Sequence, residues 1–378
     1  MFLAYKEMRH SPARYVLITT VIALITYLVF FLASLAYGLA IANRTLLDQL
    51  DSDAMIISTF ANQNITGSQL SEDDVNDIEK VADKSKVDLA KMSIALTVIH
   101  PESDEDSKIN TALVGYESGS FIEPVIIDGR APENTSEVVV SEGLRKDHGF
   151  QLGDRIILDR REEALTITAF TTPTTYATAP VIYTSLMRAN QQYLATGNEP
   201  DSPYPLSAIV VKSLVPQDAN NVPFAPIDIE SSGNKDIEYS PIPDIIWNIP
   251  GYKEQVGTFG LMIGFLVFIC AIIIGIFMFI ITMQKQISFG IMKAQGINSA
   301  FIAHSVLVQT MIVAGAGLSA GLGFTLLSGA LLPPSLPFLI NWWFYGGAAA
   351  SIVIVALMGA LFSVRQVMII DPLEAIAG

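Results

Sequence analysis

Long hydrophobic stretches without charge interrupt an otherwise polar chain. Residues 15–43, 255–284, 294–341 and 342–364 contain no Asp, Glu, Lys or Arg. Each stretch can cross the hydrocarbon core of a bilayer, which takes about 20 apolar residues in a helix. Roughly 200 mostly polar residues separate the first stretch from the second, far more than an ordinary loop holds. The pattern predicts an α-helical membrane protein with four transmembrane helices, one before and three after an inserted mixed α/β domain.

Short apolar runs and one amphipathic pattern predict the elements of the inserted domain. Ser71 with Asp74 resembles a capping box and favours a helix over 72–84, where Val75, Ile78 and Val81 recur at helical spacing. A second, short helix is expected at 142–148, and the segments 100–107 and 217–240 read as loops because they are rich in Pro, Asp and Ser. Strands are predicted at 54–58, 94–99, 111–114, 137–141, 156–158, 165–170, 181–183 and 208–211.

Charge divides the chain into two kinds of segment and orients it. The range 43–250 holds 33 acidic and 15 basic residues, whereas the whole chain carries a net charge of −15. Basic residues flank the other side of the hydrophobic stretches, at Lys6, Arg9, Arg14, Lys285, Lys293 and Arg365. Positive flanks favour the cytoplasm, so both termini are expected inside and the acidic domain outside the plasma membrane.

The hydrophobic stretches and the distribution of charge divide the chain into consecutive segments. The first hydrophobic stretch is too long for a signal peptide, so we expect an uncleaved helix that continues above the membrane surface. The predicted segments are a cytoplasmic amphipathic helix (1–14), transmembrane helix 1 (15–43), an extracytoplasmic α/β domain (44–250), transmembrane helix 2 (251–284), a cytoplasmic connecting helix (285–300), transmembrane helix 3 (301–332), an extracellular loop (333–341), transmembrane helix 4 (342–364) and a cytoplasmic tail (365–378).

Two further features concern packing within the membrane. Gly317 with Gly321, and Ser319 with Gly323, form rows of small residues that allow helices to approach closely, and we expect them to serve packing inside the bundle. The single cysteine, Cys270, lies inside the second hydrophobic stretch and excludes an intrachain disulfide.

Four segments carry a resemblance to a known family. They are the basic start 2–10, the connecting segment 286–297, the end of the chain with Asp371-Pro372-Leu373-Glu374, and the outer stretch 138–154. Together they resemble the permease subunits of MacB/FtsX-type (type VII) ABC transporters over nearly the whole chain. The resemblance departs at Ser288 and Phe289, where family members usually carry an acidic residue.

The resemblance implies that the connecting helix 285–300 is a coupling helix that contacts an ATPase. Its candidate residues are Ser288, Phe289, Gly290, Met292, Lys293 and Gly296, and Gly296 is a plausible C-terminal stop. The alternative is an ordinary interfacial loop. The chain has no Gly-Lys dipeptide and therefore no P-loop, so we expect no enzyme activity in this chain. Implied partners are two copies of a cytoplasmic ABC ATPase subunit, a second copy of this permease and the lipid bilayer, with no nucleic acid.

Within the family, the start 1–7 and the range 27–40 most resemble the haem-efflux permeases of Gram-positive bacteria. That resemblance implies haem as a transported ligand, with no intrinsic cofactor and no resident metal. Tyrosine can ligate haem iron, whereas Met and aromatic side chains suit an amphipathic substrate. For each candidate, packing or solvation is the competing role. The candidate substrate contacts are Tyr176, Tyr239, Tyr37, Met262, Asp51, Phe31 and Phe259.

Other functions within and beyond this family remain open. An antimicrobial-peptide resistance permease or a lipoprotein-release permease would share the same architecture. A non-transporting regulator of a cell-wall hydrolase is the alternative from a different class. His100 and His148 are isolated, and the sequence shows no Ser/His/Asp, zinc or paired-carboxylate pattern that would support catalysis.

Overall fold

The chain forms two compact units in a computed structural model, which describes Arg9 and residues 12–82, 85–158, 161–193, 204–214, 227, 229–333 and 336–369. The helical unit comprises Met1–Gly38 and Val256–Gly378, and the sheet unit comprises Leu39–Gln255. The predicted amphipathic helix 1–14 and the terminal motif at Asp371 lie almost wholly outside the described residues.

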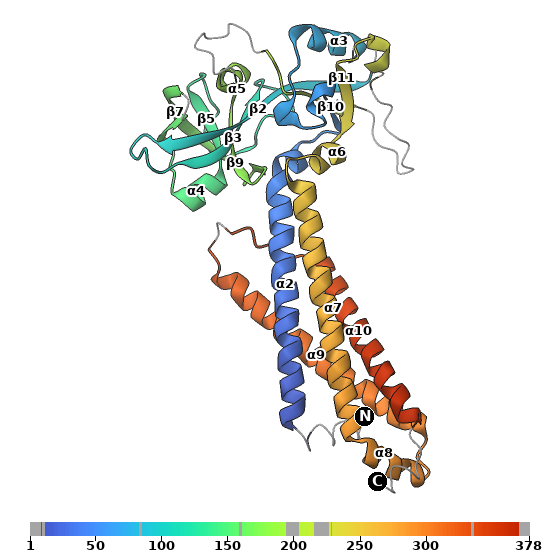
Figure 1. The fold of residues 1–378 in the computed structure, drawn as a ribbon. Coiled ribbons are helices and arrows are strands. Elements are labelled where there is room, and N and C mark those ends of the chain that lie inside the picture. The colour runs from blue at the N-terminus through green and yellow to red at the C-terminus, as the bar shows by residue number, and fades with distance from the viewer. Residues whose placement is uncertain are drawn as a thin grey trace. The chain divides into compact units, whose positions relative to one another are not determined.

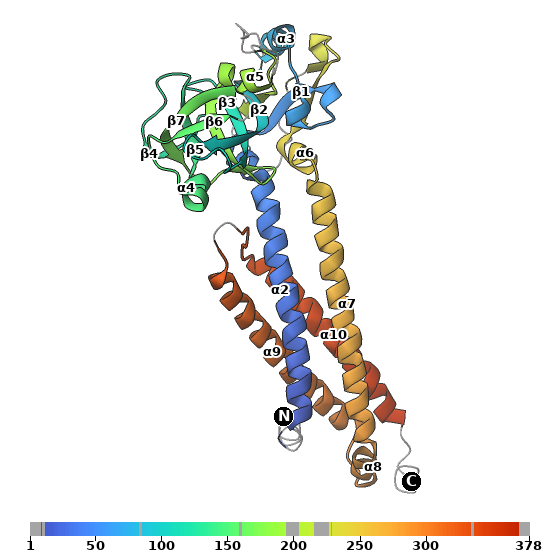
Figure 2. The same cartoon turned by 60° about the vertical axis from the view of Figure 1, so that its left-hand side comes forward.

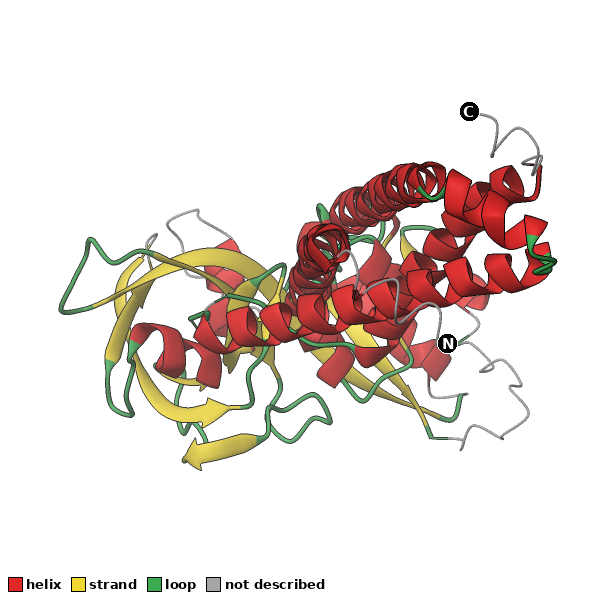
Figure 3. Ribbon diagram, turned by 90° about the horizontal axis from the view of Figure 1, so that it is seen from below, coloured by secondary structure: helices red, strands yellow, loops and turns green. Residues whose placement is uncertain are grey.

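Four long helices dominate the helical unit (Figure 1). They are α2 (Pro12–Gln49), α7 (Tyr252–Gln284), α9 (Ser299–Leu331) and α10 (Trp342–Ile369), and the short α8 (Gln286–Ala294) connects α7 to α9. All four are long and apolar enough to cross a membrane. In the described part of this unit, Figure 3 shows only helices and their connections. Along the chain, α2 precedes the described strands, and α7, α9 and α10 follow them.

Small residues bring α2 and α9 into close contact (Figure 2). A Cβ added at Gly317 would lie 2.5 Å from Ile22, and one added at Gly321 would lie 2.7 Å from Thr26. The first predicted glycine row thus packs inside the bundle. Gly323 has nothing within 4 Å of an added Cβ, so the predicted role of the second row is wrong within this protomer.

The sheet unit contains all of the described strands and seven short helical segments. Its strands are β1 (Ala54–Ser58), β2 (Val87–Pro101), β3 (Ile109–Tyr116), β4 (Ile126–Gly129), β5 (Glu137–Ser141), β6 (Arg155–Leu158), β7 (Arg161–Thr171), β8 (Thr175–Tyr176), β9 (Ala179–Ser185), β10 (Ala208–Ser213) and β11 (Ile237–Pro241). Its α-helices are α3 (Glu72–Ala82), α4 (Glu142–His148), α5 (Leu186–Tyr193) and α6 (Ile242–Trp247). The 3-10 turns are η1 (Thr59–Ala61), η2 (Ile65–Gly67) and η3 (Ile229–Ser232).

The sheet has the strand order β11-β1-β10-β2-β3-β9-β5-β7-β4. Strand β6 pairs with both β2 and β7, so the pairings β2-β3-β9-β5-β7-β6 return to β2 and close a ring. The pairs β3–β9 and β5–β7 are parallel, and the others are antiparallel. The long strand β2 serves both parts: residues 87–92 pair with β10, and residues 92–99 pair with β3.

Two hydrophobic cores stabilise the sheet unit. One fills the closed ring with residues such as Leu113, Val140, Phe170 and Ile182. The other lies between α3 and the β1, β10 and β11 strands, and it includes Ile56 and Ile78. Burial of such side chains contributes roughly 1.5–3 kcal/mol each, which is how a domain without disulfides holds its shape.

The predicted strands and helices are found, several of the strands with longer bounds than predicted. Ser71 and Asp74 exchange backbone and side-chain hydrogen bonds at the start of α3, so the capping box is confirmed. The strand 54–58, the strand 137–141 and the helix 142–148 have the predicted bounds. The loop predicted at 217–240 is wrong at its end, because residues 237–240 pair with β1 as part of β11. Helices α5 and α6 and strands β4 and β8 were not predicted.

Candidate functional site

The connecting helix α8 presents one buried and one exposed face. Phe289 is 3% exposed and packs in the core of the helical unit, together with the partly buried Met292. Ser288 is exposed, as are Ile287 and Ile291. An apolar pair on the surface of a nine-residue helix is a candidate contact for a partner protein.

Gly296 ends this segment as its position predicts. Its φ of 84° lies in the left-handed region, where glycine carries no steric penalty. Gly296 N–H donates to the Lys293 carbonyl at 2.9 Å, and Ile297 N–H donates to the Met292 carbonyl at 3.0 Å. This pair of bonds is a Schellman motif, which fixes the direction in which the chain leaves α8. Gly290 and Lys293 thus belong to a helical segment that ends at Gly296.

A buried polar chain ties the start of α8 to α2 and α9. The Lys285 ammonium donates to the Tyr15 hydroxyl at 3.0 Å, and that hydroxyl donates to Gln309 Oε1 at 2.6 Å. Gln309, which is 2% exposed, then donates to Ser305 Oγ at 3.3 Å. Polar groups in an apolar bundle are stabilised by such bonds. This series of hydrogen bonds therefore fixes the register of the three helices α2, α8 and α9. Sequence reasoning missed Tyr15 and Gln309, because each stands singly in an apolar stretch.

Tyr176 is the most deeply buried candidate substrate contact. It stands in β8, and its side chain is 1% exposed. Burial raises the pKa of its hydroxyl above the ordinary value, which disfavours the phenolate that would bind iron. A ligand role for Tyr176 therefore requires this part of the sheet unit to open.

Tyr239 stands at one end of the strand order, whereas β8 pairs with the interior strand β9. Tyr239 lies in the edge strand β11 and is partly buried, and burial together with the negative charge of Asp53 raises its pKa to about 12. Four strands separate β11 from β9, the partner of β8, and adjacent strands lie about 4.8 Å apart. Tyr176 and Tyr239 therefore lie on strands that are not neighbours in the sheet.

Asp51 is engaged at the protein surface. Its carboxylate forms an ion pair with Lys212 of β10, although the Asp51 side chain remains 79% exposed. An exposed pair of this kind contributes little to stability and leaves room for another cation.

The candidates on α2 lie in an aromatic cluster. Tyr37 packs on Phe344 of α10 with ring centroids 5.6 Å apart, and Phe31 packs on Phe338 at 5.6 Å. Further pairs extend this cluster, including the stacked rings of Phe30 and Tyr345 at 4.7 Å. Phe31 and Tyr37 thus have packing partners within the protomer.

Helix α7, which carries the candidates Met262 and Phe259, is less buried than α9. Only 12% of its most apolar window is buried, compared with 44% for α9. Met262 is 47% exposed, on a face that continues through Phe265 and Ile269, and Phe259 is partly buried one turn earlier. Met262 therefore lies on an exposed face of α7, whereas Phe31 and Tyr37 pack on other aromatic rings.

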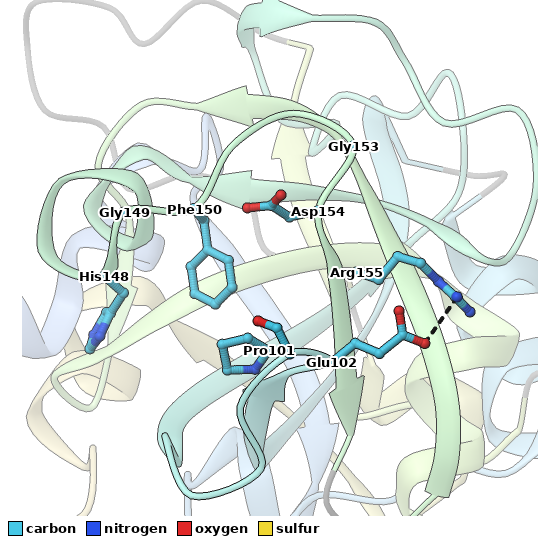
Figure 4. Close-up of a pocket in the computed structure, with 9 residues that line it drawn as sticks. Pro101, Glu102, His148, Gly149, Phe150, Gly153, Asp154 and Arg155 are labelled. Carbon is cyan, nitrogen blue, oxygen red and sulfur yellow. Dashed lines mark ion pairs between the residues drawn. The ribbon is translucent and has the colours of Figure 1, made fainter.

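A cavity of about 480 Å³ opens in the sheet unit between the end of β2 and the α4–β6 connection. Its lining includes Phe150, Asp154 and His148, and an ion pair joins Glu102 to Arg155 at 2.9 Å. Figure 4 shows His148 at one end of the cavity and the ion pair at the other. These groups do not converge on one point, and no cluster of three metal-ligating side chains occurs among the described residues.

Comparison with known proteins defines the class. Residues 260–372 match the family "FtsX-like permease C-terminal". The described part of this range contains most of α7 together with α8, α9 and α10. This part of the chain is therefore similar to an FtsX-like permease domain, and the resemblance of the sequence to the MacB/FtsX type of ABC permease is confirmed.

Two curated relatives are similar along the whole length. "Putative hemin transport system permease protein HrtB" of Staphylococcus haemolyticus is 25% identical over 378 residues, which is 100% of this chain and 99% of the relative. The protein of the same name from Staphylococcus epidermidis is 24% identical with the same coverage.

Solved structures resemble the sheet unit only distantly. The periplasmic region of MacB from Actinobacillus actinomycetemcomitans is 14% identical and covers 53% of this chain and 95% of its own, with a TM-score of 0.36. The extracellular domain of the ABC-type transporter YknZ is 12% identical and covers 49% of this chain and 98% of its own, with a TM-score of 0.32.

Proposed function

We propose that this chain is the permease subunit of an ABC efflux pump that exports haem or a similar amphipathic molecule. The observation that carries the proposal is the similarity to two hemin transport permeases over 100% of the chain. The helical unit supplies membrane spans, and α8 supplies a rigid connection with an exposed apolar face. Because the sequence contains no P-loop, the energy for transport comes from a separate ATPase subunit.

The proposed membrane arrangement follows from charge. Lys285 and Lys293 flank α8, which places this helix in the cytoplasm, where the exposed Ile287 and Ile291 contact the ATPase. The acidic sheet unit then lies outside. Two copies of the permease and two of the ATPase complete the pump, with the uncovered face of α7 lying against the second copy or against lipid.

A growth experiment tests the proposed substrate. Cells that lack their own haem exporter should resist haem when they receive this permease together with its ATPase, because both subunits are required for export. Permease alone, or permease with an ATPase that cannot hydrolyse ATP, should give no protection. Equal haem sensitivity in all three strains would remove haem as the substrate.

Cysteine accessibility tests the orientation. The single native Cys270 is replaced by alanine, and one cysteine is introduced at Glu105 in the sheet unit or at Ser288 in α8, both exposed positions. A membrane-impermeant maleimide should label Glu105→Cys in intact cells and Ser288→Cys only after permeabilisation. The opposite pattern would overturn the proposed arrangement.

A further inference from the structure

The connection between α9 and α10 is apolar and carries no charge. It comprises residues 332–341, of which 334 and 335 lie outside the described residues. No Asp, Glu, Lys or Arg occurs from residue 294 to residue 364, so α9 and most of α10 are uncharged as well. Both helices are long and apolar enough to cross a membrane. The connection therefore joins the end of one candidate span to the start of the next.

Large apolar side chains are exposed along this connection and at its two ends. Trp343 is 91% exposed, more than any other large hydrophobic side chain in the described part of the chain. The exposed set is Leu331, Leu336, Leu339, Ile340, Trp342 and Trp343. Soluble monomers rarely expose so many neighbouring apolar side chains, and such a surface marks a site of interaction with a protein or a membrane.

Most of the described backbone N–H groups in the connection are paired within the protein. Pro333 and Pro337 have no N–H group at all. Four other N–H groups donate to backbone carbonyls at 2.8 to 3.3 Å: Leu332 to Ser328, Leu336 to Pro333, Phe338 to Leu336, and Leu339 to Ser34 of α2. Non-helical backbone is tolerated in the apolar part of a bilayer only where its polar groups are satisfied. The pairing therefore lowers the cost of placing this backbone beside lipid.

One side of the connection packs on the helical unit (Figure 2). A Cβ added at Gly38 of α2 would lie 1.8 Å from the Pro337 carbonyl oxygen. A Cβ added at Gly329 of α9 would lie 2.4 Å from the Phe338 ring, and that ring also packs on Phe31 with centroids 5.6 Å apart. These contacts fix the connection on the bundle, so its exposed side chains form a surface of defined position.

The two tryptophans stand in the first turn of α10. Asn341 caps this helix, because its Oδ1 accepts from the Trp343 N–H at 3.0 Å and from the Phe344 N–H at 3.4 Å. Trp342 also contacts Tyr345, with ring centroids 5.8 Å apart. Tryptophan is enriched where hydrocarbon meets water, because its apolar ring carries one polar N–H. Adjacent tryptophans in the first turn of a span are therefore typical of a bilayer boundary.

We propose that the described residues of this connection, together with Leu331, Trp342 and Trp343, form an interfacial segment at the end of the helical unit away from α8. Its partner is the lipid at the junction of headgroups and acyl chains, not water and not another protein. A protein interface usually has a polar rim, whereas this surface continues without charge into both adjoining spans. The inference assigns the predicted extracellular loop 333–341 to the membrane surface, and it does not depend on which molecule is transported.

Fluorescence quenching in liposomes tests this placement, because the chain has only three tryptophans. Trp247→Phe leaves Trp342 and Trp343 as the emitting residues. The double variant Trp342→Phe with Trp343→Phe leaves Trp247 of α6 and is the matched control. Each full-length protein is reconstituted into phosphatidylcholine that is brominated either near the headgroup or near the chain end, and iodide is the quencher in water.

The two interfacial tryptophans should lose most of their emission to bromine near the headgroup, clearly less to bromine near the chain end, and little to iodide. Trp247 precedes the charged Lys253 and Glu254 at the start of α7, so it should respond to iodide and hardly to bromine. Strong quenching of Trp342 and Trp343 by iodide would overturn the proposal in favour of a loop in water. Quenching by neither agent would overturn it in favour of burial against a second copy or a partner protein.

A labelling experiment probes the middle of the connection without changing a tryptophan. Cys270 is replaced by alanine, and one cysteine is introduced at the exposed Leu336 or at Glu105, an exposed position of the sheet unit. In permeabilised cells, a water-soluble maleimide should label Leu336→Cys roughly tenfold more slowly than Glu105→Cys, because apolar surroundings disfavour the reactive thiolate. The two rates should converge after denaturation. Equal rates in the native membrane would contradict the proposal.

Discussion

Replacement of Tyr176 by alanine distinguishes a structural residue from a haem ligand. Tyr176 is 1% exposed and is among the largest fully buried side chains of the sheet unit. Truncation of a buried aromatic side chain costs about 3–5 kcal/mol, because both the transfer free energy and the packing around the cavity are lost. For a domain of this size, 1 kcal/mol lowers Tm by about 2–4 °C, so Tyr176→Ala should lower Tm by roughly 6–20 °C.

Thermal unfolding of the purified full-length permease, followed by the fluorescence of its tryptophans, measures this loss. Tyr176→Phe keeps the buried ring, so it should melt close to the parent. Phe60→Ala is the control for truncation of an aromatic side chain, because Phe60 is 83% exposed and should change Tm little.

A role of Tyr176 as a haem ligand predicts a different result for stability and for haem binding. A haem ligand at an accessible surface could be truncated without loss of stability, and the variant would then fail to bind haem. If Tyr176→Ala melts within about 2 °C of the parent and loses haem absorbance, the structural account of Tyr176 is refuted.

Three further predictions test other parts of the structure. Thr178→Gly, in the turn between β8 and β9, should raise the stability of the sheet unit by about 1 kcal/mol in chemical unfolding, because glycine accepts the φ of 68° without strain; a loss of stability would show that the turn is not strained. The Arg130 guanidinium lowers the pKa of the Glu137 carboxyl to about 2, so its stabilisation is complete above pH 4.5 and is lost as pH falls towards 2. Glu137→Gln should therefore flatten the acid side of the stability–pH curve, and an unchanged slope would argue against this ion pair. In α8, Ile287→Glu should reduce stimulation of the ATPase at unchanged Tm, because Ile287 is 61% exposed, whereas Phe289→Ala should lower Tm; similar thermal losses in both would contradict the assignment of the two faces.

Local patterns predict the elements that depend on nearby residues. The apolar run 54–58 is a strand because all five of its side chains are buried, and Ser71 with Asp74 starts α3 through bonds within one turn. Gly296 ends α8 for a similarly local reason, its left-handed φ. The long first helix also reaches Gln49, as its length predicts.

The remaining features depend on contacts between distant residues. The segment 237–241 contains Glu238, Tyr239 and Pro241 and reads as a loop, yet it pairs along the whole of β1. Ala177 and Thr178 carry no signal for a left-handed turn, since Gly, Asn and Asp are the usual residues there. Tyr176 sits in a polar sequence and is buried by its tertiary surroundings. The candidate substrate contacts were chosen by residue type alone, and they are divided between the sheet unit and the helical unit.

Haem transport by the purified pump tests the central proposal most directly. The permease and its ATPase are reconstituted into liposomes, haem is supplied in the membrane, and its appearance in the compartment facing the sheet unit is followed by transfer to a haem-binding protein enclosed there. The proposal predicts transfer that requires both subunits and ATP hydrolysis, and that stops with an ATPase unable to hydrolyse ATP. Transfer at the same rate without ATP, or none with the complete pump, would contradict it.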